Sequence, residues 1–259
     1  MKINLLPVIA LYIVVNVTAC TQGPAGADAA AGTGMLTGRA VLARLAKDLS
    51  AEEDNSGITV SVEGTALATQ SDKNGAWTLN NVPAGRRTVV FRKAGYGTMR
   101  VPNVPVVAEK HGFVYDMPGA QYDAVWLGKL ISLDITAIRM TVDDNVKNIN
   151  VPKFTADITA YPPDSIPMTF SLLFKKSAPP TPESYDWVKY NYRYSSIVPP
   201  EELWQAGINP GDTFYVSAVG HLSGEKFLYQ HPATGRVVIS TAEGQKGATA
   251  SFVLPPYRK

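Results

Sequence analysis

The side chains that most often carry out chemistry are sparse in this sequence and do not gather at catalytic spacing. The three histidines are His111, His221 and His231, and their spacing does not match that of metal ligands on one helix face. Two acidic runs, residues 52–54 and 143–144, could supply paired carboxylates for glycoside hydrolysis, but both are also typical of solvated turns. The sequence lacks a Gly-x-Ser-x-Gly elbow and the glycine loops that bind phosphates or dinucleotides. It therefore predicts a protein that is not an enzyme and has no catalytic residues, no metal and no cofactor.

The only cysteine, Cys20, ends an N-terminal segment that has the layout of an export signal. Lys2 supplies a positive charge, and residues 3–15 are almost wholly apolar. That run is shorter than the stretch of about 20 apolar residues that spans a bilayer core, so we expect no transmembrane helix. A single thiol allows neither an intramolecular disulfide nor a cysteine metal cluster, so the thiol is expected to have another role.

The sequence Val-Thr-Ala-Cys at residues 17–20 resembles the lipobox of bacterial lipoproteins. The resemblance implies that residues 1–19 are a signal peptide and that the Cys20 thiol accepts a diacylglyceryl group before cleavage. Two or three acyl chains, such as palmitate, would make the attachment durable, because each buried CH₂ contributes about 0.8 kcal/mol. No aspartate follows Cys20, which implies sorting to the outer membrane, facing either the periplasm or the cell surface. The alternatives are that Cys20 is an ordinary small residue or that the apolar run stays as an uncleaved anchor.

Residues 20–34 begin with the lipidated cysteine and continue as a Gly/Ala-rich segment. Gly23, Gly26 and Gly32 follow a three-residue period that Ala29 interrupts. A collagen triple helix requires glycine at every third position over many repeats, so this segment predicts a flexible tether.

The composition favours an all-β fold. The chain has 21 glycines, 19 prolines and 12 tyrosines, a mixture that suits short strands joined by turns. We therefore predict two tandem antiparallel β-sandwich domains after the signal peptide and linker, at residues 35–118 and 119–259. With 24 basic and 22 acidic side chains, the net charge of +2 argues against nucleic acid as a partner.

The first predicted domain contains strand and turn patterns that resemble one known family. Ile58, Val60 and Val62 alternate with polar residues, as in a half-buried strand. The Asn-Gly turn at residues 72–75 predicts a β-hairpin. Residues 57–98 resemble the carboxypeptidase regulatory-like domain, and the resemblance implies a small prealbumin-like β-sandwich. The zinc peptidase that accompanies this domain in some chains has no counterpart here.

Two further features of this domain each allow two interpretations. Asp72 and Asn74 could belong to a calcium loop, but the bidentate glutamate that would close such a loop is missing. Residues 42–56 are longer and more charged than a simple strand connection needs, and they predict either a short helix or an exposed loop.

The second predicted domain resembles fibronectin type III or immunoglobulin-like modules, on strand count and spacing alone. It has about seven strand candidates, as a sandwich of two sheets requires. A change in the parity of the apolar residues after Ile135 predicts a β-bulge near Ala137.

Aromatic residues alternate along residues 187–194 of this domain. Tyr190, Tyr192 and Tyr194 share one face of the predicted strand, and Trp187 lies on the other. Amphipathic rings stack on sugars and peptides, so Trp187, Tyr190 and Trp204 are candidate ligand-binding residues. The alternative is that the tyrosines fill the core of the domain.

These features together predict a non-catalytic cell-envelope lipoprotein that acts as a binding or scaffolding module. It would contact the membrane through its N-terminal lipid and would bind a protein or a glycan. Two alternatives remain: a carbohydrate-binding accessory protein of a nutrient-uptake system, and an adhesin or structural subunit that pairs an edge strand with another chain.

Overall fold

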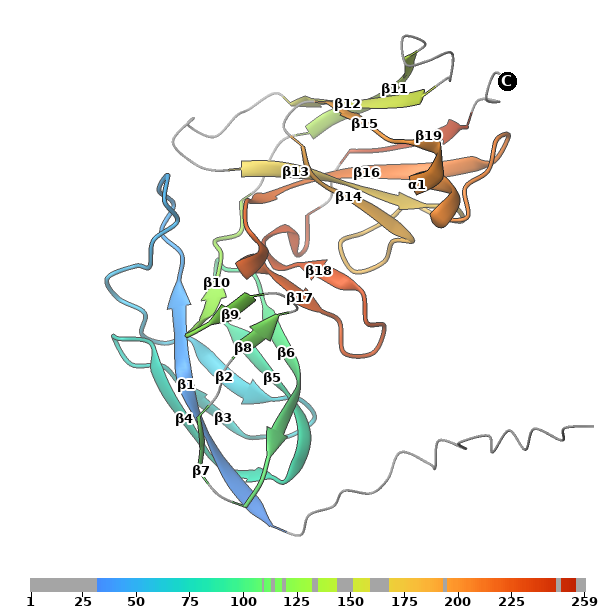
Figure 1. Cartoon of the computed structure of the whole chain (residues 1–259). Helices are drawn as coiled ribbons and strands as arrows, with labels where there is room; N and C mark the ends of the chain where they lie inside the picture. Colours follow the sequence, from blue (N-terminus) through green and yellow to red (C-terminus); the bar gives the residue numbers. More distant parts are fainter. Residues whose placement is uncertain are drawn as a thin grey trace, which may run out of the picture.

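The computed structural model describes residues 32–108, 110–112, 115–117, 120–131, 135–143, 151–158, 168–192, 195–245 and 248–254. Most of these residues lie in β-strands, and nearly all strand pairs are antiparallel, which confirms the predicted all-β fold class. The strands form two sandwiches that follow one another along the chain (Figure 1). Residues 1–31, which include the predicted signal peptide and Cys20, lie outside the described residues.

The first sandwich packs two sheets face to face. Its strands are β1 (Thr33–Leu42), β2 (Thr59–Val62), β3 (Ala68–Gln70), β4 (Ala76–Pro83), β5 (Gly85–Arg92), β6 (Met99–Val106), β7 (Lys110–Gly112) and β10 (Val125–Leu127). One sheet has the order β3-β2-β5-β6, and in the other β1 lies between β4 and β10 and also pairs with β7. Strand β1 is antiparallel to β4 but parallel to β7 and β10. A separate hairpin joins β8 (Tyr115–Met117) to β9 (Ala120–Tyr122).

The predicted alternation of apolar residues builds the core of this sandwich. Ile58, Val60 and Val62 are all buried, and they belong to one hydrophobic cluster with residues of both sheets. Within that cluster the ring of Trp77 meets Phe91 edge-on, with the two centroids 5.6 Å apart. Edge-to-face packing of this kind stabilises an aromatic pair beyond the burial of its apolar area.

The Asn-Gly turn reverses the chain, but it does not join a hairpin. Asp72 Oδ1 accepts hydrogen bonds from the backbone N–H groups of Asn74 and Ala76, at 2.8 and 2.9 Å, and Gly75 has a φ of 82°. Strand β3 before the turn pairs with β2, whereas β4 after the turn pairs with β1. The hairpin prediction is therefore wrong. Turn chemistry fixes the reversal, whereas pairing depends on where each strand buries its apolar side chains.

The second sandwich also has two sheets. Its elements are β11 (Ile135–Asp143), β12 (Val151–Ile158), β13 (Met168–Lys175), β14 (Trp187–Tyr192), β15 (Ser195–Ile197), α1 (Pro200–Gln205), β16 (Thr213–Leu222) and β19 (Thr249–Val253). The sheet orders are β11-β12-β15 and β14-β13-β16-β19. The register of β11 against β12 shifts between Ile135 and Ala137, which confirms the predicted bulge. Phe154, Phe174 and Phe214 meet in the buried core between the sheets.

Residues 223–245, which we call the inserted hairpin, leave the second sandwich between β16 and β19. They contain η1 (Glu225–Phe227), β17 (Leu228–Gln230), β18 (Val237–Ile239) and η2 (Ser240–Ala242). On one side, Ile239 packs with Tyr185 and Val219 of the second sandwich. On the other side, Tyr229 and Val238 belong to the hydrophobic core of the first sandwich. The inserted hairpin therefore lies between the two sandwiches and contacts both (Figure 1).

Two glycines of the first sandwich allow this close approach. A Cβ atom at Gly97 would overlap the carbonyl group of Ser240, and one at Gly128 would overlap the side chains of Thr241 and Phe227. Neither glycine has a left-handed φ, so space rather than backbone conformation requires it. Phe227 is fully buried at this junction, in a cluster that includes residues from the first sandwich.

Polar contacts add to the apolar packing at the junction. The Thr98 N–H donates to Glu243 Oε2 at 2.7 Å, and Arg100 donates to the Tyr229 hydroxyl at 3.0 Å. Lys226 donates to the Leu49 carbonyl at 2.9 Å and lies 3.7 Å from the centroid of the Trp126 ring. Cation–π contacts are strongest when the cation is partly desolvated, as Lys226 is here.

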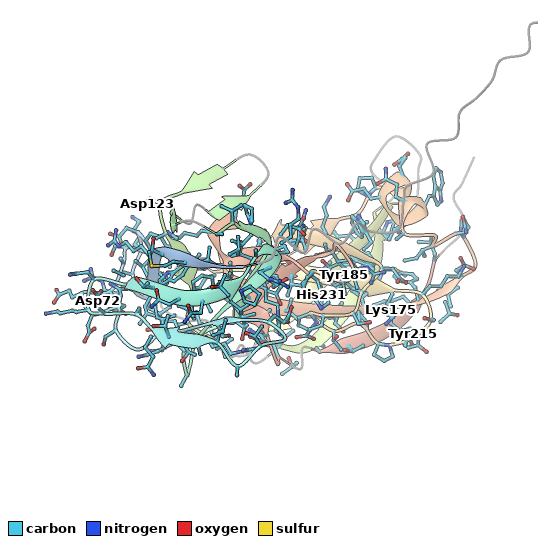
Figure 2. The ribbon with its side chains drawn as sticks, turned by 90° about the horizontal axis from the view of Figure 1, so that it is seen from below. Asp72, Asp123, Lys175, Tyr185, Tyr215 and His231 are labelled. Carbon is cyan, nitrogen blue, oxygen red and sulfur yellow. The ribbon has the colours of Figure 1, made fainter. Side chains whose placement is uncertain are left out.

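The junction involves residues on both sides of the predicted domain boundary. Strand β10 follows residue 118, yet it pairs with β1 of the first sandwich. Figure 2 shows Asp72 and Asp123 at one end of the molecule, Tyr185 and His231 near its middle, and Lys175 and Tyr215 toward the other end. The division at residue 118 itself stays a prediction.

We predict that Phe227→Ala lowers the free energy of unfolding by about 3–5 kcal/mol, because it leaves a cavity where the sandwiches meet. Urea denaturation of the purified protein measures this loss. The matched control is Val107→Ala, since Val107 is 44% exposed and should change stability by no more than about 0.5 kcal/mol. Equal losses for the two variants would contradict the role given to Phe227.

Candidate functional site

Two of the three candidate aromatic residues lie on opposite faces of β14. Trp187 is half-buried and packs against the second sandwich core, with its ring centroid 4.9 Å from that of Phe174. Tyr190 is also half-buried, but it packs with the cluster that the inserted hairpin covers and hydrogen-bonds to Tyr185. Burial raises the pKa of the Tyr190 hydroxyl far above its usual value. The structure therefore does not bring Trp187 and Tyr190 together on one surface.

Tyr190 shares its face of the predicted strand with Tyr192 and Tyr194, and we call these three residues the tyrosine stripe. Tyr194 and the side chain of Tyr192 lie outside the described residues. Val188, which precedes Tyr190 on the same face, is half-buried against the same cluster. In the part of the stripe that the structure describes, the side chains thus pack toward the inserted hairpin.

Trp204 differs from the other two candidates because its side chain is 46% exposed. It lies on α1, a short helix that the neighbouring residues attach to the sandwich. Leu203 is fully buried in the second sandwich core. Glu202 accepts hydrogen bonds from Lys189 Nζ of β14, at 2.7 Å for each carboxylate oxygen. Residues one step apart on a helix point about 100° apart, so burial of Leu203 directs Trp204 outward.

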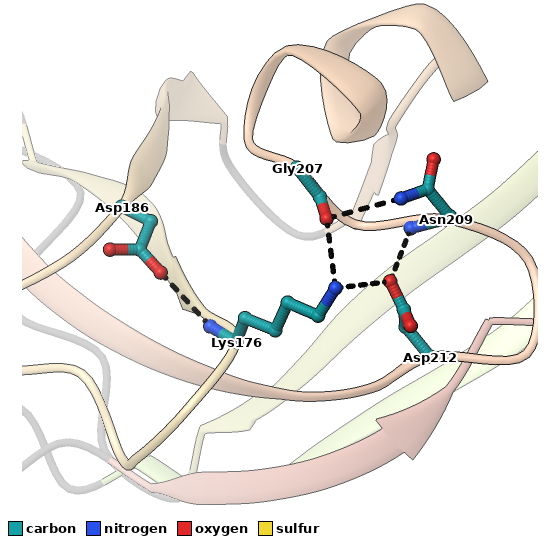
Figure 3. A network of polar contacts seen from close by, with 5 residues as sticks. All are labelled: Lys176, Asp186, Gly207, Asn209 and Asp212. Carbon is teal, nitrogen blue, oxygen red and sulfur yellow. Dashed lines mark hydrogen bonds and ion pairs between the residues drawn. The ribbon is translucent and has the colours of Figure 1, made fainter.

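A network of polar contacts fixes the loop that follows α1 (Figure 3). Lys176, just after β13, forms an ion pair with Asp212 at 2.8 Å and donates to the Gly207 carbonyl at 3.3 Å. Asp212 Oδ2 also accepts the Asn209 N–H at 2.8 Å. The Lys176 backbone N–H donates to Asp186 Oδ2 at 3.0 Å, which connects the loop before β14 to the same network. Sequence reasoning missed these residues, because they are far apart in the chain and belong to no motif.

Hydrogen bonding holds the pKa of Asp212 below its usual value. The largest contribution comes from the hydrogen bond with Lys176, and the Asn209 N–H adds to it. Both donors stabilise the charged carboxylate, so Asp212 is ionised at neutral pH. The Asp212 carboxylate and the Lys176 ammonium group thus hold each other in fixed positions at this loop.

One serine and one histidine have the geometry of a nucleophile and a general base, but they are enclosed. His221 Nε2 lies 2.8 Å from Ser171 Oγ, and Nδ1 lies 2.9 Å from the Leu222 carbonyl oxygen. A neutral ring satisfies both contacts when Nδ1 donates and Nε2 accepts. Ser171 is fully buried and His221 is 2% exposed, so no substrate reaches the pair. Its role is to hold β13 and β16 together.

Other candidate reactive side chains that the structure describes form hydrogen bonds within their own turns. The Asp54 carboxylate accepts the Ser56 N–H at 2.9 Å, and this bond lowers its pKa. The carboxylate of Asp72, proposed above as an alternative calcium ligand, is used by its own turn. His231 Nδ1 accepts the Ala233 N–H at 3.3 Å. The side chains of His111, Asp143 and Asp144 lie outside those that the structure describes.

The loop at residues 42–56 contains turns and bends but no helix, which decides between its two predicted forms. Leu49 has a φ of 46°, in the left-handed region that non-glycine residues rarely occupy. A shallow depression beside this loop is lined by Arg44, Ala46, Lys47 and Asp48. It is wide open to solvent and does not enclose a ligand.

Among the described residues, no group of three or more histidine, cysteine, aspartate or glutamate side chains could hold a metal ion. Within the same residues, no helix has the length and apolar character needed to cross a membrane.

Comparison with known proteins finds a family match for one part of the chain. Residues 48–114 match the family model of the carboxypeptidase regulatory-like domain. This match supports the resemblance found in residues 57–98 and covers most of the first sandwich. No curated protein matches the chain.

Solved structures give more distant matches. A type II cohesin–X-dockerin complex from Acetivibrio cellulolyticus, carrying an N-terminal interface mutation, is 27% identical over 30% of this chain, with a TM-score of 0.25. This chain spans about half of that matched chain, at 51%. A proposed carbohydrate-binding protein from Bacteroides uniformis is 10% identical over 86% of this chain and 99% of its own, with a TM-score of 0.25. A DUF3823 family protein from the same species is 10% identical over 86% of this chain and 100% of its own, with a TM-score of 0.25.

We predict that stability falls on acidification because His221 is buried as a neutral ring. Burial lowers its pKa from 6.5 to about 4. The neutral form therefore stabilises the fold fully above pH 6.5, and this contribution is lost as the pH falls toward 4. The loss amounts to about 3 kcal/mol by linkage.

Urea denaturation at pH 7 and pH 4 tests this expectation in three proteins. His221→Gln keeps a donor and an acceptor and should reduce the pH dependence. His231→Gln, on the inserted hairpin, is the matched control for replacing a histidine with glutamine. An unchanged pH dependence in His221→Gln would show that other groups cause the acid sensitivity.

Proposed function

We propose that this protein is a lipid-anchored cell-envelope protein of the outer membrane that binds a protein or glycan partner without catalysis. The observation that carries the proposal is the inserted hairpin, which packs into both sandwiches and makes them one body. A rigid body on a flexible tether suits presentation of a binding surface at a distance from the lipid.

The position of β1 supports this arrangement. Strand β1 begins at Thr33, so the last two residues of the predicted tether belong to the strand. It begins at the end of the first sandwich that is remote from the second (Figure 1). The Ala84 N–H donates to the Gly32 carbonyl at 3.1 Å, so the chain is attached to the sandwich from its first described residue. A lipid on Cys20 would therefore hold the first sandwich near the membrane and the second sandwich away from it.

The burial pattern supports binding rather than catalysis. The Ser171–His221 pair has catalytic geometry, but it is sealed inside the second sandwich. The exposed Trp204, by contrast, lies on the surface of that sandwich beside fixed polar groups. Binding requires such surface groups, whereas catalysis requires an accessible reactive pair.

We predict that Cys20→Ala abolishes lipid attachment in a bacterial host that processes lipoproteins. The thiol forms the thioether, so the variant should lose incorporation of labelled palmitate and leave the membrane fraction. Metabolic labelling followed by fractionation measures both effects.

Thr18→Ala is the matched control, because alanine keeps the small side chain that signal peptidase accepts. It should retain both label and membrane location. Labelling of Cys20→Ala at the parent level would exclude the lipid anchor.

A further inference from the structure

The surface around Trp204 is held rigidly by its neighbours. Leu203 and Ile208, on either side of Trp204 in sequence, are fully buried in the second sandwich core. Gly207 follows the helix C-cap with a φ of 73°, and its N–H donates to the Trp204 carbonyl at 2.9 Å. An exposed indole on a backbone that is held in this way can bind a ligand without a further loss of backbone entropy.

Polar side chains bind the loop that follows α1, the helix that carries this indole. The Gly207 backbone that donates to Trp204 also accepts from Lys176 Nζ, so the polar network begins two residues after the last residue of α1. The contacts to the Asp212 carboxylate reach Oδ2. The Asn209 side chain also hydrogen-bonds to Asp212. A carboxylate or amide oxygen has two lone pairs and an ammonium group has three N–H donors, so Asp212, Asn209 and Lys176 have the capacity to bond a ligand as well.

The end of β19 is hydrogen-bonded to the same loop. The Leu254 N–H donates to the Asp212 carbonyl at 3.0 Å, and the Gly211 N–H donates to the Leu254 carbonyl at 2.8 Å. Val253, which precedes Leu254, is 57% exposed and pairs with Thr213. The surface thus combines an aromatic ring, polar loop groups and an aliphatic side chain.

The size and composition of this surface favour a glycan over a protein. A stable protein interface buries about 800 Å² on each partner around an apolar centre. In the described part of the second sandwich, the exposed large apolar side chains are Trp204 and Val253, too few for such a centre. A pyranose ring needs less: its C–H face covers one indole, and its rim of hydroxyl groups requires nearby acceptors and donors.

We propose that this end of the second sandwich binds a glycan, with a pyranose ring stacked on Trp204 and its hydroxyl groups bonded to Asp212, Asn209 and Lys176. The inference rests on the proposed function as a binding protein and names the class of its ligand. It assigns the ligand to the α1–β16 loop rather than to Trp187 or Tyr190.

Affinity electrophoresis tests this proposal with the full-length protein purified in detergent. Native gels are cast with soluble polysaccharides of different backbones: amylopectin, pullulan, xylan, galactomannan and arabinogalactan. The parent protein should be retarded by at least one of them. Trp204→Ala should bind that polysaccharide at least about ten-fold more weakly, and Trp204→Phe should bind with intermediate strength.

Two controls separate loss of contact from loss of fold. Val107→Ala removes an exposed apolar group from the first sandwich and should bind like the parent. Asn209→Ala should weaken binding with little change in the urea midpoint, since its side chain makes a long 3.4 Å contact to Gly207 and the smallest of the contributions to the pKa of Asp212. Each variant is compared at the same folded fraction, measured by urea denaturation.

Three outcomes would overturn the glycan site. These are a parent protein that no polysaccharide retards, a Trp204→Ala variant that loses less than about ten-fold, and a defined protein partner that binds this surface without any glycan. None of them bears on the lipid anchor, because the Cys20→Ala fractionation measures membrane attachment independently. A failure of the anchor would equally leave the glycan measurement standing.

Discussion

Packing of the inserted hairpin between the two sandwiches is the interaction on which the arrangement of the whole body depends. Tyr229 and Val238 complete the first hydrophobic core, while Ile239 packs on the second sandwich. Each fully buried side chain of this size contributes about 1.5–3 kcal/mol. Gly97 and Gly128 permit the approach because nothing larger fits between the surfaces.

The inserted hairpin also determines which of the candidate aromatic residues face solvent. It covers the face of β14 that carries Tyr190, and the opposite sheet covers the face that carries Trp187. Trp204 remains exposed because it lies on α1, at a position that neither layer covers. The available binding surface is therefore set by tertiary packing, although all three residues have the side-chain chemistry that stacking requires.

Local patterns were reliable where they depend on neighbouring residues alone. The alternation of Ile58, Val60 and Val62 predicted a buried strand face, and the parity change after Ile135 predicted a bulge. Partners distant in sequence were not predictable: the turn at Asp72 links two sheets instead of a hairpin, because pairing is a property of the folded sandwich. The network joining Lys176 to Asp212 likewise has no sequence signal, since only the fold brings its members together. The alternation along β14 did predict that Trp187 and Tyr190 point apart, but it could not tell what covers each face.

The sequence position of the inserted hairpin also affects the order of folding. The first sandwich is made from the early part of the chain, yet Tyr229 and Val238 of its core come from near the end. A chain emerging from the ribosome therefore holds an unfinished first core, with apolar surface uncovered, until almost all of it has been synthesised. Contacts between such distant residues slow folding and lengthen the period of exposure to aggregation. Any truncation that removes the hairpin would leave the first sandwich in that unfinished state.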